Sequence, residues 1–555
     1  MNTLRYRSFL VPVILLLTAV CLTLPIYYFG MPGGNDLPQH YRFIHTFYDS
    51  VRSGDFYPSW PGDTNLGFGD IGIRFYPPLA YYVVIIFRSL TESWTTALAG
   101  AICFWFFLSG LGTYLLARES FSEKASLAGA VIFMAMPYHA NQVYNAGLFA
   151  EFPGLAILPF CFLFVRRIIL SGKAFEVAGL AISFALLILA HLPLVIIGSM
   201  GLSVYGLTLL NRDNVRSGII KLGSGVAAAL AMSSFYWIRM VTELPLVNHT
   251  LPQFTESKYD FHQNFLAGIF YVPLAEYGET SLWFTDILLA LTLAMIVPAV
   301  AIFYAAGKSS HRKSLNPLLT VLVSAILIAT PISLPLWNHA PILDRIQFPW
   351  RFLGLISLIG SVLIAASFDE VAASFKTKFR PLALVAVGAI VAGFAFTAAQ
   401  VIRPATFSTR AEFDTNLEKY RDDQSYECWW PVSAKQIALK DRSRVSAQER
   451  AVEITRWTND EREFTVDDGP AAAVRVAIFY YPFWNANAAG NNLGIRPAED
   501  GSILVDVPSG PASVTLTFVR PLYEIYSRYI SIAAWLLVLI AAAASIIVGR
   551  RAQFK

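Results

Sequence analysis

Two residues that could carry acid–base chemistry stand four positions apart near the start of the chain. Asp36 precedes the amphipathic stretch 37–49, and His40 lies in its first turn, so the two side chains share a face if a helix begins at Leu37. Asp36 could simply cap this helix. The pair could instead deprotonate a hydroxyl acceptor, with Asp36 as the general base and His40 orienting the acceptor or taking up the proton. We expect this second role.

Two arginines stand close together just before an apolar run. Arg345 and Arg351 lie in the stretch 344–352, which is also rich in aromatic residues. Guanidinium groups bind phosphate through paired hydrogen bonds. We therefore predict that Arg345 and Arg351 bind a lipid phosphate or pyrophosphate, with Arg74 as a further candidate. The alternative is that they only anchor the end of a helix at the membrane surface.

Other polar side chains lie at or near the ends of apolar runs, where an ionisable group is costly and often functional. We predict that the following residues position the substrate: Glu151, His139, His191, Gln347, Tyr76 and His262. The ionisable ones among them could instead be interface groups whose hydrogen bonds are satisfied within the protein. Only two potential metal ligands are evident beside each other, Asp36 and His40, so no cofactor is predicted, and a metal-assisted reaction stays open.

The elements that must position these residues are mostly apolar. Of the 555 residues, 55% are hydrophobic and 14% are charged, whereas soluble globular proteins have about 25% charged residues. This composition excludes a disordered protein, a soluble multidomain enzyme and a secreted disulfide scaffold. The four cysteines predict neither a disulfide framework nor a thiolate metal site. A net charge of +4 gives no support for a nucleic-acid partner.

Twelve apolar runs are candidate membrane spans, for which roughly 17–25 residues are needed. The first is too long for a cleaved signal peptide, and no small-residue cleavage site follows it. The third, fifth, sixth and ninth are short or weakly bounded. The runs are 9–30, 95–117, 125–139, 148–165, 175–190, 194–210, 218–238, 284–306, 315–331, 352–368, 381–400 and 528–549.

Lysine and arginine predict the orientation of these spans, because cytoplasmic loops are enriched in them. Both termini and every second connection are basic, which predicts that both termini lie in the cytoplasm. The loops 31–94, 239–283 and 332–351 and the segment 401–527 then face the outer side of the membrane. The basic segments contain Arg5/Arg7, Arg118/Lys124, Arg166/Arg167/Lys173, Arg212/Arg216/Lys221, Lys308/Arg312/Lys313, Lys376/Lys378/Arg380 and Arg550/Arg551/Lys555.

This orientation restricts the chemistry of the site. A site that faces outward has no supply of ATP or nucleotide sugars. The glycine-rich stretches also lack the Lys-Ser/Thr pair of a phosphate-binding loop. A transferase with such a site would therefore need an activated donor that is held in the membrane.

The segment 401–525 has a different composition from the rest of the chain. It holds 32 of the 80 charged residues. Apolar residues alternate with polar ones in 452–454, 503–507 and 514–518, and Pro508 to Pro511 form a turn between the last two runs. We predict a small β-rich domain, with a sandwich as its architecture, tethered by helices on both sides.

The loop 31–94 resembles the first periplasmic loop of GT-C glycosyltransferases, with an acidic residue directly after the first span and two surface helices, expected at 37–49 and 76–90. More narrowly, it resembles the bacterial membrane family labelled pyruvoyl-tetrahydropterin-synthase-related. The matching stretches are 35–40, 54–60, 65–69, 75–79, 147–152, 190–193 and 347–352, and 479–486 looks like the aromatic strand of the β-domain in related proteins.

The resemblance implies a GT-C fold of about 12 spans, transfer of a sugar from a polyprenyl-phosphate donor, and Asp36 as the catalytic base. The chain departs from the GT-C pattern at one position. Many GT-C enzymes have a second acidic residue beside the first, whereas this chain has Leu37 there, and this difference bears on a metal-assisted reaction. The predicted parts are a transmembrane catalytic module over 1–400, a periplasmic β-rich domain over 401–527, and a last span with a cytoplasmic tail over 528–555.

Our leading hypothesis is an inverting, metal-independent glycosyltransferase in the lipid bilayer of a bacterial inner membrane. Its site faces the periplasm, and its acceptor is an envelope glycan or glycolipid. Two alternatives come from other classes. A transporter or flippase of lipid-linked glycans would be favoured by charged residues at the membrane midplane. A non-catalytic membrane protein could use the β-domain to bind an envelope polymer.

Overall fold

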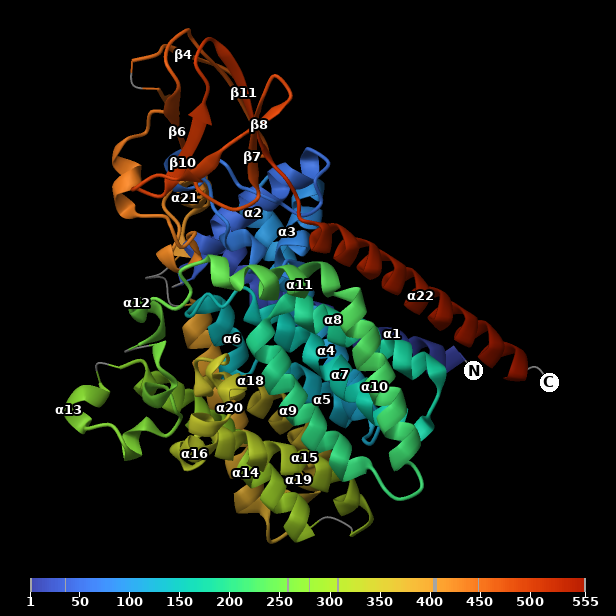
Figure 1. The fold of residues 1–555 in the computed structure, drawn as a ribbon. Helices are drawn as coiled ribbons and strands as arrows, with labels where there is room; N and C mark the ends of the chain where they lie inside the picture. The colour runs from blue at the N-terminus through green and yellow to red at the C-terminus, as the bar shows by residue number, and fades with distance from the viewer. Residues whose placement is uncertain are drawn as a thin grey trace.

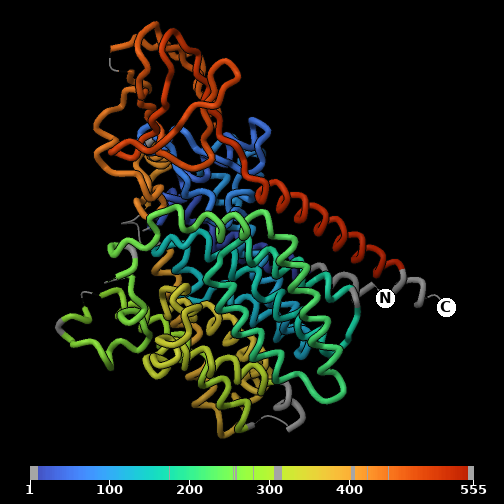
Figure 2. The backbone as a smooth tube through the Cα atoms, viewed as in Figure 1, coloured from blue at the N-terminus to red at the C-terminus, as the bar shows by residue number. Residues whose placement is uncertain are grey.

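The protein is a helical bundle with a β-sheet domain at one end, as Figures 1 and 2 show for the computed structural model. Asn35, Lys308 and Lys555, which supported the loop motif and the orientation, lie outside the described residues. The structure describes residues 2–34, 36–256, 259–278, 280–306, 309–402, 407–447 and 449–553.

Nine helices in the described part of the chain are long and apolar enough to cross a membrane, so the prediction of a polytopic helical membrane protein is confirmed. The last of them, α22, runs along one side of the bundle (Figure 1) and packs on α8, α10 and α11. These nine are α1 (Asn2–Phe29), α4 (Trp94–Arg118), α7 (Glu151–Ser171), α9 (Leu192–Leu209), α10 (Val215–Met232), α14 (Leu282–Ala306), α18 (Phe352–Ala366) with the turn before it, α20 (Arg380–Ile402) and α22 (Leu522–Gln553).

Three other runs that were predicted to span form shorter or broken helices. The run 125–139 is divided into α5 (Glu123–Met134) and α6 (Pro137–Tyr144), because Pro137 forces the preceding Met136 into an extended conformation. The helix α8 (Ala174–Ala190) is a shorter apolar helix, and α15 (Ser309–Ala329) bends by 79° into the segment Pro331–His339. The count of twelve spans therefore stays a prediction.

The remaining helices are short and connect the spans or cover one end of the bundle. The two expected surface helices are present as α2 and α3, and α2 begins beside Pro38, whose fixed φ angle suits a first helical turn. The short helices are α2 (Leu37–Arg52), η1 (Asn65–Gly67), η2 (Gly72–Arg74), α3 (Leu79–Leu90), α11 (Ser234–Glu243), η3 (Leu244–Leu246), α12 (Pro252–Thr255), η5 (Phe261–Gln263), η6 (Gly268–Phe270), α13 (Leu274–Tyr277), η7 (Pro331–Ser333), α16 (Leu334–His339), α17 (Pro341–Asp344), η8 (Pro349–Arg351), α19 (Phe368–Ser374), α21 (Arg410–Asp422), η10 (Glu427–Trp429) and η11 (Gln436–Lys440).

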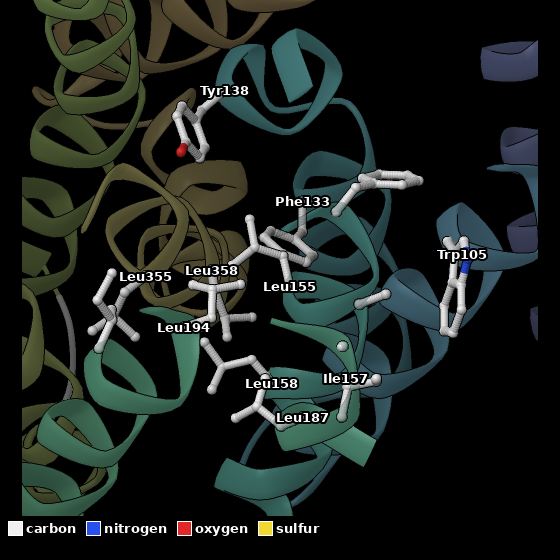
Figure 3. Close-up of a cluster of buried hydrophobic side chains, with 14 of the residues drawn as sticks. Trp105, Phe133, Tyr138, Leu155, Ile157, Leu158, Leu187, Leu194, Leu355 and Leu358 are labelled. Carbon is white, nitrogen blue, oxygen red and sulfur yellow. The ribbon is translucent and has the colours of Figure 1, made fainter. Parts of the chain in front are cut away.

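The centre of the bundle is an apolar core around α18, all of whose residues are buried. Figure 3 shows Leu155, Leu194 and Leu358 in this core, contributed by three different helices. Gly354 allows close packing, since a Cβ there would lie 2.7 Å from Leu155. Small residues of this kind let helix backbones approach within a membrane.

The C-terminal strands form a sandwich of two antiparallel sheets, which confirms the predicted β-rich domain. One sheet has the order β3-β6-β10-β9 and the other has β4-β5-β11-β7-β8. Inward residues alternate with outward ones, as in β5 and β11. The strands are β3 (Val445–Ser446), β4 (Val452–Trp457), β5 (Glu461–Val466), β6 (Ala472–Phe479), β7 (Trp484–Ala488), β8 (Asn491–Leu493), β9 (Ile495–Pro497), β10 (Ser502–Val507) and β11 (Ala512–Phe518).

The aromatic stretch 479–486 is not one strand, contrary to the prediction. β6 ends at Phe479, β7 begins at Trp484, and the residues between them turn the chain from one sheet to the other. Pro482 stands in this connection, where its missing N–H removes no bond from a sheet.

The loop 31–94 shares the core of the sandwich. Trp60 and Phe68 belong to the same buried cluster as Phe479 and Trp484, and the rings of Trp60 and Trp484 lie 5.6 Å apart. The short strand β1 (Met31–Pro32) also pairs with β2 (Phe407–Ser408). The helical part and the β-domain are thus joined by the contacts of this loop as well as by the covalent chain.

Candidate active site

Asp36 occupies the N-cap position of α2, and its side chain makes no capping hydrogen bond. The residue is exposed, yet neighbouring groups exclude enough water to raise the pKa of its carboxyl above the usual 3.8, and the positive charge of Arg351 opposes this rise. The carboxylate is therefore accessible and not engaged as a cap, and it lies within electrostatic range of Arg351.

His40 is buried against aromatic rings on the next turn of α2. Its Nδ1 lies 2.8 Å from the hydroxyl of Tyr81, and its ring contacts Tyr76 and Phe149 at 5.7 and 5.3 Å. Burial lowers the pKa of His40 to about 3, so the imidazole is neutral near pH 7. A neutral, hydrogen-bonded ring suits a positioning role better than uptake of a proton.

Tyr76 lies at the centre of an aromatic group beside Asp36. Its ring contacts Phe43 of α2 at 4.7 Å and Trp429 of the C-terminal domain at 5.4 Å. Burial raises the pKa of Tyr76, and the negative charge of Asp36 adds to that rise. The phenol is thus protonated and close to the carboxylate.

Arg351 and Glu151 form an ion pair between two distant parts of the sequence. Arg351 Nε lies 3.3 Å from Glu151 Oε2, and the side chains are 10% and 1% exposed. The other oxygen of Glu151 accepts hydrogen bonds from Tyr138 at 2.6 Å and from Gln142 at 2.9 Å. This buried carboxylate fixes the guanidinium of Arg351 from one side.

The turn before α18 directs the two arginines of the predicted pair differently. Arg351 Nη1 donates to the carbonyl of Ile346 at 2.5 Å. Between these two residues, Gln347 adopts a left-handed conformation with φ +67°, which turns the chain back on itself. Arg345 is exposed. Arg351 thus points inward to Glu151, while Arg345 lies at the surface of the same turn.

The three histidines predicted as positioning residues have different surroundings. His191 caps α9, accepting from the Leu194 N–H at 3.3 Å, and lies within electrostatic range of Arg351 and His40. His139 is fully buried in the apolar core, where it stacks on Phe133 at 4.7 Å. The structure therefore brings His191, and not His139, to the site.

His262 lies in the long loop after α11. Its Nδ1 is 2.7 Å from Asp260 Oδ1, its Nε2 is 3.1 Å from Asn338 Oδ1, and its side chain is 48% exposed. The contact with Asn338 joins η5 to α16 at the surface, and the structure gives no contact between His262 and Asp36 or Arg351.

Arg74, the third predicted phosphate ligand, is fully buried beneath the sandwich. It donates to both oxygens of Glu243 at 2.6 and 2.5 Å and to Glu524 at 2.6 Å. Glu243 also accepts from the hydroxyls of Tyr481 and Tyr523. Because its guanidinium is already bound by two carboxylates, we leave Arg74 out of the site proposed below and treat it as the anchor of the sandwich on the bundle.

Replacing Glu243 by glutamine should destabilise the protein. Arg74 would keep one buried carboxylate instead of two, and removing one partner of a buried ion pair typically costs about 3 kcal/mol. Thermal unfolding in detergent should show a lower Tm, with the sandwich opening first in limited proteolysis. Glu453→Gln, on an exposed position of β4, is the matched control. An unchanged Tm for Glu243→Gln would contradict the anchoring role.

Several residues of the site were not found from the sequence. Tyr138 and Gln142 both reach Glu151, and their spacing of four on α6 was the available signal. Trp429 and Tyr81, which contact Tyr76 and His40, carry no local signal because their partners lie far away in the sequence. Within the described residues, no three His, Cys, Asp or Glu side chains come together as a metal site.

The fold and the site define a multi-span membrane protein with a polar site between the helical bundle and the loop that joins its sandwich. The chain belongs to the family described as 6-pyruvoyl-tetrahydropterin synthase related domain, membrane protein, whose model matches residues 73–401. This confirms the resemblance seen in the sequence. A search of curated proteins found no match.

Solved structures with a similar chain path are membrane glycosyltransferases. Arabinofuranosyltransferase AftD from Mycobacteria is 16% identical over 70% of this chain, which spans only 27% of AftD, with a TM-score of 0.43. ArnT from Cupriavidus metallidurans, bound to undecaprenyl phosphate, is 15% identical, with 74% and 75% of the two chains covered and a TM-score of 0.43. The Archaeoglobus fulgidus oligosaccharyltransferase in the apo form is 15% identical, with 77% and 61% covered and a TM-score of 0.41.

Proposed function

We propose that the protein is an integral-membrane glycosyltransferase that moves a sugar from a polyprenyl-phosphate donor to a hydroxyl of an envelope glycan or glycolipid. The observation that carries this proposal is Asp36, an accessible carboxylate that heads a helix without capping it. The likeness of the loop 31–94 to the first periplasmic loop of GT-C enzymes supports the same position for the base.

In the proposed reaction, Asp36 accepts the proton of the acceptor hydroxyl as its oxygen attacks the anomeric carbon of the sugar. The bond between that carbon and the phosphate oxygen breaks, the configuration inverts, and polyprenyl phosphate leaves with the electron pair. The sugar is thereby joined to the acceptor through a new glycosidic bond.

Arg351 is the group best placed to stabilise the leaving phosphate. Its Nε faces Glu151 and its Nη1 binds the Ile346 carbonyl, and neither contact uses Nη2. A fixed cation aimed at a developing negative charge lowers the barrier without having to reorganise. Arg345, exposed on the same turn, would bind the phosphate from the membrane surface.

The remaining polar groups would hold the substrates in place. Glu151 orients Arg351, and His191 lies close to both Arg351 and His40. Gln347 and Tyr76 border the turn and the base. The basic connections between the spans support an orientation in which this end of the bundle lies on the periplasmic side of a bacterial inner membrane and both termini lie in the cytoplasm.

The activity can be tested with the purified protein in proteoliposomes. Undecaprenyl-phosphate-linked pentoses and hexoses are supplied one at a time with extracted envelope glycolipid, and release of undecaprenyl phosphate is measured together with sugar in the glycolipid. We expect one donor to be consumed with transfer of its sugar. Release from no donor, with the protein correctly folded, would contradict the proposal.

The rate of transfer should increase with pH along a single acid limb. Because the base form of Asp36 is required and its pKa is raised, the midpoint should lie above 3.8. His40, with a pKa of about 3, stays neutral over this range and adds no second limb. The test is kcat/KM measured from about pH 4 to about pH 8, since this ratio reports groups of the free enzyme. A profile that stays flat down to about pH 4 would contradict the assignment.

A further inference from the structure

Gln39 is a buried amide without a partner beside the proposed base. Its side chain is 1% exposed, and neither Nε2 nor Oε1 has a hydrogen-bond partner among the described residues. Buried amides are nearly always paired, because water bonds are lost on burial. An unpaired amide at this place therefore points to a ligand that supplies both a donor and an acceptor.

Asp36, Gln39 and Arg42 follow one another at intervals of three, so Gln39 is a neighbour of both Asp36 and Arg42 on the surface of α2. Arg42 Nη1 donates to the carbonyl of Gln424 at 2.6 Å. This bond places the start of the connection 424–430, which leads from α21 into the β-domain, on the same side of α2 as Gln39.

The other end of this connection also lies against the site. Trp429 stacks on Phe75, with ring centroids 5.4 Å apart and planes at 17°, and contacts Tyr76 edge-on at 5.4 Å. Tyr76 in turn contacts Phe43 of α2. The connection 424–430 therefore follows α2 from Arg42 toward Asp36.

Tyr426, in the middle of this connection, is 40% exposed. Burial of part of the ring raises the pKa of its phenol, and the negative charge of Asp36 adds to the rise. An accessible aromatic ring and an unpaired amide thus both lie near the carboxylate.

We propose that Gln39 and the connection 424–430 form the acceptor side of the site, a subsite for a saccharide whose hydroxyl faces Asp36. This inference rests on the proposed function and names its acceptor class. A primary amide can donate to one hydroxyl of a sugar and accept from its neighbour, while the rings of Tyr426 and Trp429 offer apolar surface to the face of a sugar ring. The β-domain thereby contributes directly to the reaction site.

The test uses saturation-transfer difference NMR on the purified full-length protein in detergent, with methyl pyranosides and methyl furanosides as probes. We expect at least one glycoside to bind the wild type and its Kd to rise tenfold or more in Gln39→Leu and in Trp429→Leu. Binding of undecaprenyl phosphate, measured in parallel, should change less than twofold. Trp457→Leu, in β4 of the same domain, is the matched control.

A second variant separates binding from folding. Trp429→Phe keeps a ring to stack on Phe75, so its Tm should match the wild type, and its glycoside Kd should lie between those of the wild type and Trp429→Leu. The subsite is wrong if no glycoside binds the wild type, or if Gln39→Leu binds glycosides as the wild type does. If glycosides bind and no donor is consumed, the transfer proposal fails and the subsite stands. If transfer proceeds and the variants have the same acceptor KM as the wild type, the subsite proposal fails and the transfer proposal stands.

Discussion

Asp36→Asn should lower the rate of sugar transfer by about 10²–10⁴-fold, the range that general-base catalysis contributes. The amide has nearly the same shape but cannot take the proton of the acceptor. The pKa of Asp36 is raised, so the ionised carboxylate is disfavoured in the folded state, and this penalty is fully present above that pKa. The substitution removes the penalty, so the Tm near pH 7 should be unchanged or higher.

The matched control for this variant is Asp49→Asn on the same helix. Asp49 pairs with Arg421 at 2.6 Å, and both side chains are about 40% exposed, so its loss should cost no more than about 1 kcal/mol and leave transfer intact. The measurement is release of undecaprenyl phosphate in proteoliposomes together with thermal unfolding. Near-normal transfer by Asp36→Asn would show that Asp36 is not the base.

Arg351→Met should lower transfer by 10²-fold or more, on the order of the loss when a fixed donor to a developing negative charge is removed. It should also lower the Tm, because Glu151, which is 1% exposed, would be left as a buried carboxylate without its cation. The free energy of unfolding should decrease by about 3–5 kcal/mol. Binding of the leaving group is measured with undecaprenyl phosphate, and its Kd should rise with the loss of activity.

A double variant distinguishes catalysis from packing. In Glu151→Gln with Arg351→Met, both buried charges are removed, and the amide can still accept from Tyr138. The Tm should return close to that of the wild type, while transfer and undecaprenyl phosphate binding stay low. If activity returned along with stability, Arg351 would serve only to neutralise Glu151, and the phosphate would have to bind elsewhere.

Much of the fold could be predicted because its signals are local. Apolar runs such as 9–30 and 381–400 are long enough to predict a span by themselves, and the alternation of apolar and polar residues in 503–507 predicts a strand. The structure differs from the predictions where a proline or a turn changes the path of the chain, as at Pro137 and in 479–486. Three consecutive aromatic residues give the same hydrophobic signal in a strand and in a turn between two sheets.

For the proposed site, the sequence predicted Asp36 as the base from its position directly after a span and before an amphipathic helix, and this role stays a prediction. It also identified Glu151 and Arg351, but not that they pair, because 200 residues separate them and only the packing of α7 beside α18 brings them together. Arg74 and Arg351 look alike in the sequence. One is enclosed by two carboxylates and the other is held by one.

The sequence by itself determined that this is a multi-span membrane protein with a β-rich domain and an acidic group at the first span boundary, because hydrophobicity and its period depend only on neighbouring residues. The tertiary structure alone decided which polar groups share a site. It placed Trp429 against Tyr76, joined the loop 31–94 to the core of the sandwich, and enclosed His139 in apolar side chains. The physical reason is that the chemistry of a side chain depends on its partners and its access to water, and both come from parts of the chain that are far apart in sequence.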